Sequence, residues 1–140
     1  MTIRDLMTRT VETASPDETV LDARDRFRES GFHHLPIIDD RGRLVGLVSD
    51  RDVLRAAGPS LGAHRYDSDA GPGIDRALRE IMARDVVTAD PLMSIEEAVD
   101  TMLTDDISSL PVVDNEALVG IVTTADLLRY AAGQERALSP

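Results

Sequence analysis

The sequence of 140 residues contains no cysteine, no tryptophan and no lysine, and it has only two tyrosines and two phenylalanines. Without cysteine the chain forms no disulfide and offers no thiolate to a metal. It has no run of 18 apolar residues, the length that a helix needs to cross a bilayer, and it begins without the apolar stretch of a signal peptide. These absences predict a cytoplasmic, disulfide-free protein with no membrane partner.

The charge balance is acidic, with 26 aspartates and glutamates against 15 basic residues and a formal net charge of −11. All the basic residues are arginines, and no two of them are adjacent. Binding to a nucleic-acid backbone needs a basic patch, and binding to single strands needs aromatic platforms for the bases. The sequence therefore predicts no nucleic-acid partner.

The strongest positive feature is an internal duplication. Residues 3–57 align with residues 78–131 of the second copy, which extends to 132, and 20 of 54 paired positions are identical. The offset is 75 before a one-residue gap at Gly42 and 74 after it. A repeat of this size is one supersecondary unit that buries its apolar face by packing against its neighbour. We therefore expect a pseudo-symmetric pair of units, with the groove between them as the natural ligand site.

Each copy contains the same order of predicted elements. It opens with a short amphipathic turn, IRDLM or LREIM, and a β-like stretch, VETAS or VVTAD. A helix follows, and its start fits a capping box in both copies, Thr19 with Asp22 and Ser94 with Glu97. The second copy then places apolar residues at helical spacing, and the first copy repeats most of this stripe but has Arg24 where the second has Val99. We expect Arg24 to be a solvated helix residue.

Two short apolar runs and a second helix complete each copy. The runs HLPIID and LVGLVS, and SLPVVD and LVGIVT, are separated by turn residues and are typical of hairpin strands. The second helices are predicted at about 50–57 and 124–132. The unit is thus βαββα, an α+β fold with two repeats packed sheet to sheet. The expected boundaries are repeat 1 at 1–57, a flexible linker at 58–77, repeat 2 at 78–132 and a C-terminal tail at 133–140.

A repeated motif lies at the junction between the last strand and the second helix. It is GLVSDRD from Gly46 to Asp52 and GIVTTAD from Gly120 to Asp126. A hydroxyl delivered to a helix N-terminus lies where unpaired N–H groups attract an anion such as phosphate. An Asp three residues later can accept hydrogen bonds from a vicinal diol. Sugar and phosphate recognition together indicate a nucleotide.

A second interpretation fits the same spacing. Ser49 with Asp52 and Thr123 with Asp126 also match the capping-box pattern, so both pairs are explained without any ligand. On that interpretation Gly46 and Gly120 need another reason, such as the close approach of another backbone segment. The spacing alone favours the cap and leaves both interpretations open.

The repeat as a whole resembles a tandem pair of CBS domains, the cystathionine β-synthase type or Bateman module. The resemblance rests on VxT…P near the start, LPIID or LPVVD in the middle, and GLVSDRD or GIVTTAD at the end, and it covers about residues 3–132. It implies a regulatory, non-catalytic module that binds adenosine-type ligands between the repeats. The implied ligands are AMP, ADP or ATP, with S-adenosylmethionine or NAD as alternatives, and no further cofactor is required.

The resemblance also assigns residues. It makes Asp52 and Asp126 the ribose ligands and puts Ser49 and Thr123 near phosphate. The residues that it implies around the adenine are Val11, Thr13, Leu35, Pro36, Val86, Thr88, Leu110 and Pro111. The proline-bounded strands Leu35-Pro36 and Leu110-Pro111 fit a core position at least as well as a contact.

The two copies differ near the proposed phosphate. His33 and His34 occupy positions at which the γ subunit of the AMP-activated kinase, which the chain resembles there, carries basic residues that meet phosphates. Arg51 is a further candidate for neutralising a phosphate, whereas repeat 2 has Ser108, Ser109 and Ala125 at these positions. Two histidines on surface strand positions are the plain alternative. We expect no metal site, because adjacent histidines on a strand point to opposite faces.

Our function prediction is a stand-alone adenine-nucleotide sensor that signals through changed shape or stability to an effector protein. The family implies a homodimer through helices, for which Val53, Leu54, Leu127 and Leu128 are candidates, half of them expected in the core. A ligand-free dimerisation scaffold is the main alternative. An enzyme using Asp39 and Asp40 or Asp105 and Asp106 is disfavoured, because such turn acids are usually solvated and lack a nucleophile and base beside them. We expect Arg55 and Arg129 to be solvated residues near helix ends.

Overall fold

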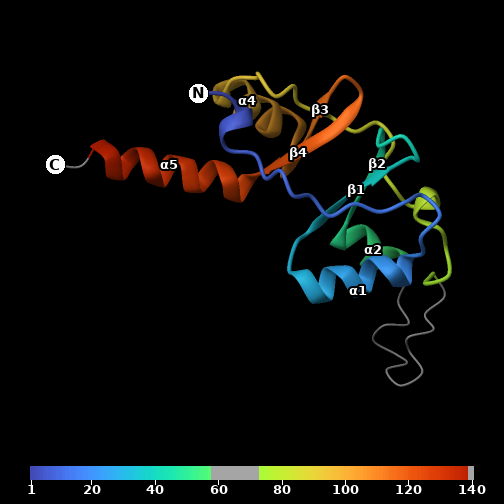
Figure 1. Cartoon of the computed structure of the whole chain (residues 1–140). Coiled ribbons are helices and arrows are strands. Elements are labelled where there is room, and N and C mark those ends of the chain that lie inside the picture. The colour runs from blue at the N-terminus through green and yellow to red at the C-terminus, as the bar shows by residue number, and fades with distance from the viewer. Residues whose placement is uncertain (58–72, 139–140) are drawn as a thin grey trace. The chain divides into compact units, whose positions relative to one another are not determined.

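The computed structural model describes residues 1–57 and 73–138 and forms two compact units (Figure 1). The repeat-1 unit comprises Glu12–Val86, and the repeat-2 unit combines Met1–Val11 with Val87–Pro140. Residues 58–72 of the expected linker lie outside the described residues. The expected repeat boundaries stay a prediction about the sequence, because the compact units divide the chain at other positions.

The two units contain the same elements. In the repeat-1 unit these are α1 (Val20–Ser30), β1 (His34–Ile38), β2 (Leu44–Ser49), α2 (Asp50–Ala57) and the 3₁₀ turn η3 (Leu78–Glu80). In the repeat-2 unit they are the 3₁₀ turn η1 (Ile3–Asp5), α4 (Ile95–Asp105), β3 (Ser109–Asp114), β4 (Ala117–Thr123) and α5 (Thr124–Leu138). Two small antiparallel sheets and their helices confirm the predicted α+β class. Helix α5 continues into the segment expected as a tail.

The opening strand predicted for each repeat is shorter than expected. Ala14 makes a single parallel bridge to Ile37 of β1, and Ala89 makes the same bridge to Val112 of β3. In each case two backbone hydrogen bonds of 2.9–3.0 Å hold the segment on the edge of the hairpin. Only one residue pairs, so the segment serves as an edge clamp on the hairpin.

The one-residue gap between the repeats falls in the hairpin turns. The turn of repeat 1 uses Gly42 with φ of 81°, whereas that of repeat 2 uses Asn115 and Glu116 with φ of 52° and 70°. Both hairpins carry an irregular register at equivalent positions, between Ile37 and Ile38 and between Val112 and Val113. The strands before and after the gap are therefore equivalent in structure as well as in sequence.

The predicted helix starts are confirmed at both first helices. Thr19 accepts a hydrogen bond from the Asp22 N–H at 3.2 Å, and Asp22 accepts one from the Thr19 N–H at 2.9 Å. Ser94 accepts from the Glu97 N–H at 3.0 Å, so its cap is present, but the return bond from Glu97 that the predicted capping box requires is shown for Thr19 and Asp22 and not for this pair. Each cap satisfies helix donors that would otherwise lack a partner, which typically stabilises a protein by about 1 kcal/mol.

The opening turns are exchanged between the two units. Turn η1 of repeat 1 packs in the repeat-2 unit, where Ile3 N–H donates to the Met93 carbonyl at 2.9 Å. Turn η3 of repeat 2 packs in the repeat-1 unit, where Leu78 N–H donates to the Glu18 carbonyl at 2.8 Å. Ile3 and Leu78 have 0% exposure, so each anchors the opening turn of its own repeat in the core of the other repeat's unit. Neither repeat is complete without a segment from the other.

The glycine of the junction motif makes room for this exchange. A Cβ on Gly46 would lie 2.3 Å from Met82 Sδ and 3.1 Å from the Ala83 carbonyl oxygen. A Cβ on Gly120 would lie 2.6 Å from Met7 Sδ and 3.0 Å from the Thr8 carbonyl oxygen. Ala83 and Thr8 each exchange two backbone hydrogen bonds with the strand residue after the glycine. The expected close approach of a backbone segment is thus confirmed.

Each unit has its own hydrophobic core. Leu35, Ile37 and Val48 of the first hairpin pack with α1 and Met82, and the equivalent Leu110, Val112 and Val122 pack with α4 and Ile3. The expectation for Arg24 was wrong, because its side chain is only 13% exposed. Its Nη2 lies 3.5 Å from Asp25 Oδ1, so the head group stays near a carboxylate although the side chain is mostly buried.

No helix within the described residues is long and apolar enough to span a bilayer.

Replacing Gly46 by valine should destabilise the protein by about 1–3 kcal/mol, because the new side chain overlaps Met82 and crowds the Ala83 backbone. Urea unfolding measures the change. Adding Met82→Ala to the variant should recover part of the loss by making space. Gly133→Ala is the matched control, since nothing lies within 4 Å of a Cβ there and alanine favours a helix. Equal destabilisation at Gly46 and Gly133 would contradict the packing argument.

Candidate functional site

The junction of β2 and α2 is a complete capping box. Ser49 N–H donates to Asp52 Oδ2 at 2.9 Å, and Asp52 N–H donates to Ser49 Oγ at 3.1 Å. The second carboxylate oxygen, Oδ1, accepts from Arg55 Nη2 at 2.6 Å. The Asp52 side chain is 22% exposed. Strand and helix thus meet at a carboxylate that is held by the cap and still reached by solvent.

The junction of β4 and α5 repeats this arrangement. Thr123 N–H donates to Asp126 Oδ2 at 2.8 Å, and Asp126 N–H donates to Thr123 Oγ1 at 3.3 Å. Arg129 Nη2 lies 2.5 Å from Asp126 Oδ1. The carboxylate is more buried than its counterpart, with 8% exposure. The capping interpretation of the motif is therefore confirmed in both repeats.

The cap does not occupy the whole carboxylate. In each repeat Oδ2 serves the cap, while Oδ1 faces an arginine whose own side chain is 74% or 71% exposed. Ion pairs with such exposed partners contribute about 0–1 kcal/mol, because water and salt screen them. A ligand hydroxyl can therefore compete for Oδ1 without breaking the cap. Arg55 and Arg129 are exposed as expected, but their pairing with the aspartates was not foreseen.

Within the repeat-1 unit, several predicted site residues lie at one end of the hairpin. His34 pairs with Ser49 in the register of β1 and β2, and Asp52 follows Ser49 by one helical turn. The parallel bridge of Ala14 with Ile37 places Thr13 beside Pro36. Because neighbours in register share a face, Thr13, His34 and Ser49 lie on the face opposite the core residues Leu35 and Val48. The sequence pattern predicted the residue set but not this common face.

The two histidines differ in their surroundings. The exposed His33 lies with Nδ1 2.9 Å from Asp50 Oδ2, and its carbonyl accepts from the Asp50 N–H at 3.0 Å. His34 is half-buried, and burial lowers its pKa below the usual value for histidine. His33 also lowers this pKa, while Asp50 and Asp52 oppose the shift. The neutral form of His34 is thus favoured in the folded chain.

The residues expected around an adenine are placed unequally. Leu35 and Leu110 have 0% exposure in the two cores, and Pro36 and Pro111 are fully buried, so the core alternative describes these four side chains. Val11, Thr13 and Val86 are half-buried, whereas Thr88 and Arg51 are exposed. Val11 and Val86 are the last residues before the chain passes from one unit to the other.

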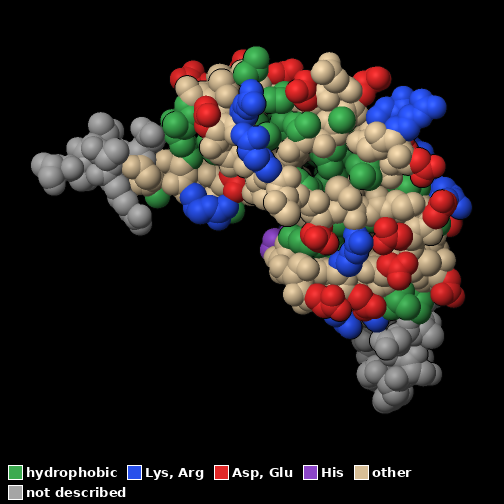
Figure 2. Space-filling view, viewed as in Figure 1, with side chains coloured by type: hydrophobic (Ala, Val, Ile, Leu, Met, Phe, Trp, Pro, Cys, Tyr) green, Lys and Arg blue, Asp and Glu red, His purple; other side chains and the backbone are tan. Residues whose placement is uncertain are grey.

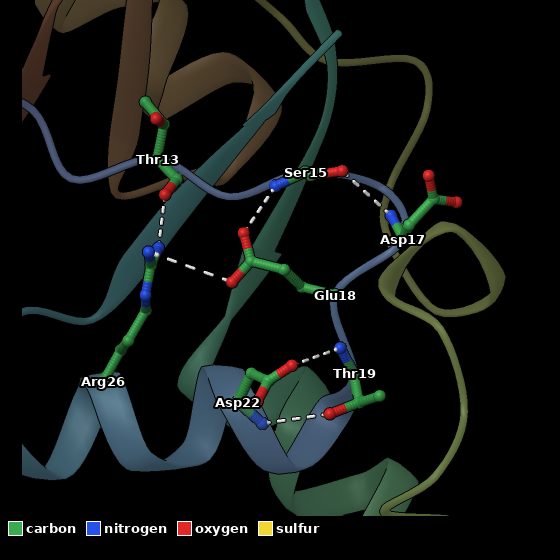
Figure 3. Close-up of polar contacts among 7 residues, drawn as sticks. All are labelled: Thr13, Ser15, Asp17, Glu18, Thr19, Asp22 and Arg26. Atoms are coloured by element: carbon green, nitrogen blue, oxygen red, sulfur yellow. Dashed lines mark hydrogen bonds and ion pairs between the residues drawn. The ribbon is translucent and has the colours of Figure 1, made fainter. Parts of the chain in front are cut away.

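A cluster that the sequence analysis missed ties Thr13 to α1 (Figure 3). An Arg26 guanidinium N–H donates to the Thr13 carbonyl, and Arg26 Nη2 lies 3.8 Å from Glu18 Oε1. Glu18 Oε2 in turn accepts from the Ser15 N–H at 2.9 Å. Arg26 stands opposite Thr101 in the aligned repeats, so the difference between the copies was the only available signal.

Of the acids considered for catalysis, Asp39 and Asp106 have structural roles. Asp39 Oδ1 accepts from the Arg41 and Arg43 N–H groups at 2.9 Å, and these backbone bonds hold the pKa of Asp39 below its ordinary value. Asp106 ends α4 with φ of 53°. Figure 2 shows acidic and arginine side chains interspersed on the face that it draws. Among the described residues, no group of three His, Cys, Asp or Glu side chains is placed to hold a metal.

A family model described as CBS domain matches the chain twice, at residues 3–58 and 78–133. The CBS domain-containing protein YhcV of Bacillus subtilis is 32% identical over 125 residues, which cover 89% of this chain and 81% of YhcV. Two similar solved structures carry ligands in their descriptions. The CBS domain pair of protein MJ0100, in complex with 5′-methylthioadenosine and S-adenosyl-L-methionine, has a TM-score of 0.79 at 28% identity, covering 96% of this chain and 98% of that one. CBSX2 in complex with AMP has a TM-score of 0.80 at 28% identity, with the same coverage.

Other relatives are longer. The chain spans 47% of the uncharacterized protein MJ1225 of Methanocaldococcus jannaschii, about half its length, at 35% identity over 132 residues. It spans 24% of an L-aspartate semialdehyde sulfurtransferase and 21% of an inosine-5′-monophosphate dehydrogenase from the same organism. In these enzymes the matching region is a minor part of the whole.

Because burial lowers the pKa of His34, protonation should favour the unfolded state, in which the imidazole is solvated. The stability contributed by neutral His34 is present above the unfolded pKa of about 6.5 and is lost as pH falls below it. The melting temperature should therefore fall from pH 7.5 to 5.5 more steeply in wild type than in His34→Gln. His33→Gln should flatten the slope less than His34→Gln does, because His33 is a smaller cause of the His34 shift than burial is. Equal slopes in wild type and His34→Gln would contradict the prediction.

Proposed function

This chain belongs to the CBS domain family, and from that premise we propose that it is a regulatory module that binds an adenosine-type nucleotide. AMP, ADP or ATP is the leading ligand class, and S-adenosylmethionine and NAD are alternatives. The supporting comparisons are the similar structures whose descriptions name AMP, S-adenosyl-L-methionine and 5′-methylthioadenosine. The chemistry is binding without turnover, and the response is a change of shape or stability that an effector protein in the cytoplasm detects.

The observation that carries the proposal is that the two carboxylate oxygens of Asp52 have different partners, as do those of Asp126. In both repeats one oxygen is fixed by the cap and the other meets only an exposed guanidinium. A ribose diol that displaces or shares this guanidinium would find an acceptor already oriented by the helix cap. Hydrogen bonds to a charged acceptor contribute about 1.5–3 kcal/mol each, enough to outweigh a screened ion pair.

The phosphate part of the proposal rests on the same junctions. Ser49 and Thr123 stand at the N-termini of α2 and α5, where N–H groups and the helix dipole favour an anion. In repeat 1 the exposed Arg51 adds positive charge, and His34 lies beside Ser49. Repeat 2 has neutral residues at these positions. We therefore expect ligands with more phosphate charge to favour the repeat-1 junction.

The ligand-free scaffold remains the competing function, and a specific observation favours it. Both motifs are complete helix caps, so their residues are accounted for without a nucleotide. The two functions differ in what a ligand does to the folded protein. Binding to the native state at one hundred times the dissociation constant adds about 2.7 kcal/mol of stability, whereas a scaffold gains none.

Calorimetry and thermal shift with AMP, ADP, ATP, S-adenosylmethionine and NAD should give a saturable signal for at least one ligand. Asp52→Asn and Asp126→Asn should each weaken binding at their own junction by about ten- to a hundredfold, the loss of one hydrogen bond to a charged acceptor. Asparagine retains an oxygen for the cap, so these variants should fold.

Thr19→Ala is the matched control, because it removes a helix cap of the same kind away from the junction. It should lower the melting temperature and leave the affinity unchanged. A folded wild-type protein that responds to none of the five ligands would refute the nucleotide proposal and leave the scaffold.

A homodimer is a further part of the proposal. Val53 and Leu127 pack with the cores, whereas Leu54 and Leu128 are 59% and 65% exposed at equivalent positions of α2 and α5. Exposed leucines repeated on both second helices favour an apolar contact with a second copy of the chain.

Sedimentation equilibrium should show a dimer for wild type and a shift toward monomer for the Leu54→Glu, Leu128→Glu double variant, because two buried charges oppose association. Leu103→Glu is the control, since Leu103 is 75% exposed on another helix. A monomeric wild type, or equal dissociation by the control, would refute this assembly.

A further inference from the structure

The Arg26–Glu18 cluster joins three parts of the repeat-1 unit. Arg26 belongs to the second turn of α1, Glu18 lies just before that helix, and both reach the edge segment that carries Thr13 and Ser15 (Figure 3). The Thr13 carbonyl accepts from Arg26, and the Ser15 N–H donates to Glu18. Because Arg26 also pairs with Glu18, the two side chains form a closed bracket around the backbone from Thr13 to Ser15.

The bracketed segment has other bonds at Ala14 and Ser15. Ala14 bridges to β1, with Ala14 N–H donating to the Pro36 carbonyl and Ile38 N–H donating to the Ala14 carbonyl. The Ser15 carbonyl accepts from the Glu18 N–H at 3.1 Å, and the Ser15 hydroxyl accepts from the Asp17 N–H at 3.2 Å. The bracket adds the bond from Arg26 to the Thr13 carbonyl, so its main effect is to orient the backbone at Thr13.

Repeat 2 has no chemistry for the same bracket. Met93 stands at the position of Glu18, and Thr101 stands at the position of Arg26. Met93 carries no charge, and the Thr101 hydroxyl donates to the Glu97 carbonyl inside its own helix at 2.8 Å. Thr88, the counterpart of Thr13, is therefore held by the Ala89 bridge without a charged clamp. Thr88 is also exposed, whereas Thr13 is half-buried.

The bonds that Arg26 and Glu18 make are suited to orienting the Thr13 segment. The Arg26 and Glu18 side chains are 35% and 30% exposed, so the ion pair itself is partly screened. The bonds to the backbone are charge-assisted and directional, and they order a segment that would otherwise lose conformational freedom on binding a ligand. A segment ordered before binding pays less of that entropy when the ligand arrives.

We propose that Arg26, held by Glu18, is a positioning residue that pre-organises the Thr13 segment and makes the Asp52 site the tighter of the two nucleotide sites. This proposal rests on the proposed function, which supplies the nucleotide ligand. The bracket is the observation that predicts which of the two sites binds more tightly. Arg26 touches the backbone of the segment and acts through it.

The binding test separates the two sites. In the Asp126→Asn background, which leaves the Asp52 site, Arg26→Gln should weaken AMP binding by about tenfold. In the Asp52→Asn background, which leaves the Asp126 site, Arg26→Gln should change AMP binding less than twofold. Arg26→Lys keeps a charged donor and should restore part of the affinity. Equal weakening at both sites, or none at the Asp52 site, overturns the proposal.

Introducing the bracket residues into repeat 2 tests the same difference in affinity between the two sites. Met93→Glu with Thr101→Arg gives repeat 2 the two bracket residues at equivalent positions. In the Asp52→Asn background this double variant should tighten AMP binding by several-fold. Unchanged affinity in a folded double variant shows that the bracket does not separate the two sites and overturns the proposal.

Hydrogen exchange tests the bracket without any ligand. The Ser15 amide should exchange more slowly than the Asp90 amide at the equivalent position, and Arg26→Gln should remove most of that difference while the core Val48 amide stays protected. Loss of protection only through global unfolding would overturn the bracket as a local device. If the exchange difference is present but wild type binds none of the five ligands, the proposed function fails and the claim of unequal affinities falls with it.

Discussion

The structure depends on the crossing of each opening turn over the hairpin of the other repeat. Turn η1 carries Met7 across Gly120, and η3 carries Met82 across Gly46, at distances that leave no room for a Cβ. Each crossing is fixed by paired backbone hydrogen bonds and by one fully buried anchor, Ile3 or Leu78. Because each core contains a residue of the other repeat, neither core is formed by one repeat alone.

The junction aspartates show why a helix cap and a ligand site are not exclusive. The cap uses one oxygen and fixes the carboxylate plane, and the exposed arginine one turn later uses the second oxygen weakly. A carboxylate held in this way keeps its orientation whether or not a hydroxyl arrives. The same argument applies to Asp126, whose carboxylate is less exposed. Sequence spacing alone leaves the two roles as rivals, whereas the geometry gives the cap to one oxygen and so leaves the other for the proposed ligand.

Short sequence patterns predicted the features that depend on residues close together in the sequence. The caps at Thr19 and Ser94, the hairpins and the helix starts follow from residues within a few positions of one another, and they were predicted correctly. The exchange of turns was not predictable, because IRDLM and LREIM carry the same pattern and fit either hairpin equally well. Arg24 was expected in solvent because a helical pattern does not show that a charged side chain at one position is mostly buried. The common face of Thr13, His34 and Ser49 needed the bridge register, which no periodicity contains.

The positions at which the repeats agree and differ then separate fold from function. The capping aspartates, the crossing glycines and the arginines at 55 and 129 occur in both copies, and all of them hold the junction or the exchange. The histidines, Arg51 and the bracket occur only in repeat 1. Repeat 2 completes the same fold with neutral residues at these positions, so the fold does not require the repeat-1 groups. This difference supports the proposal that the groups of repeat 1 serve a ligand at one junction.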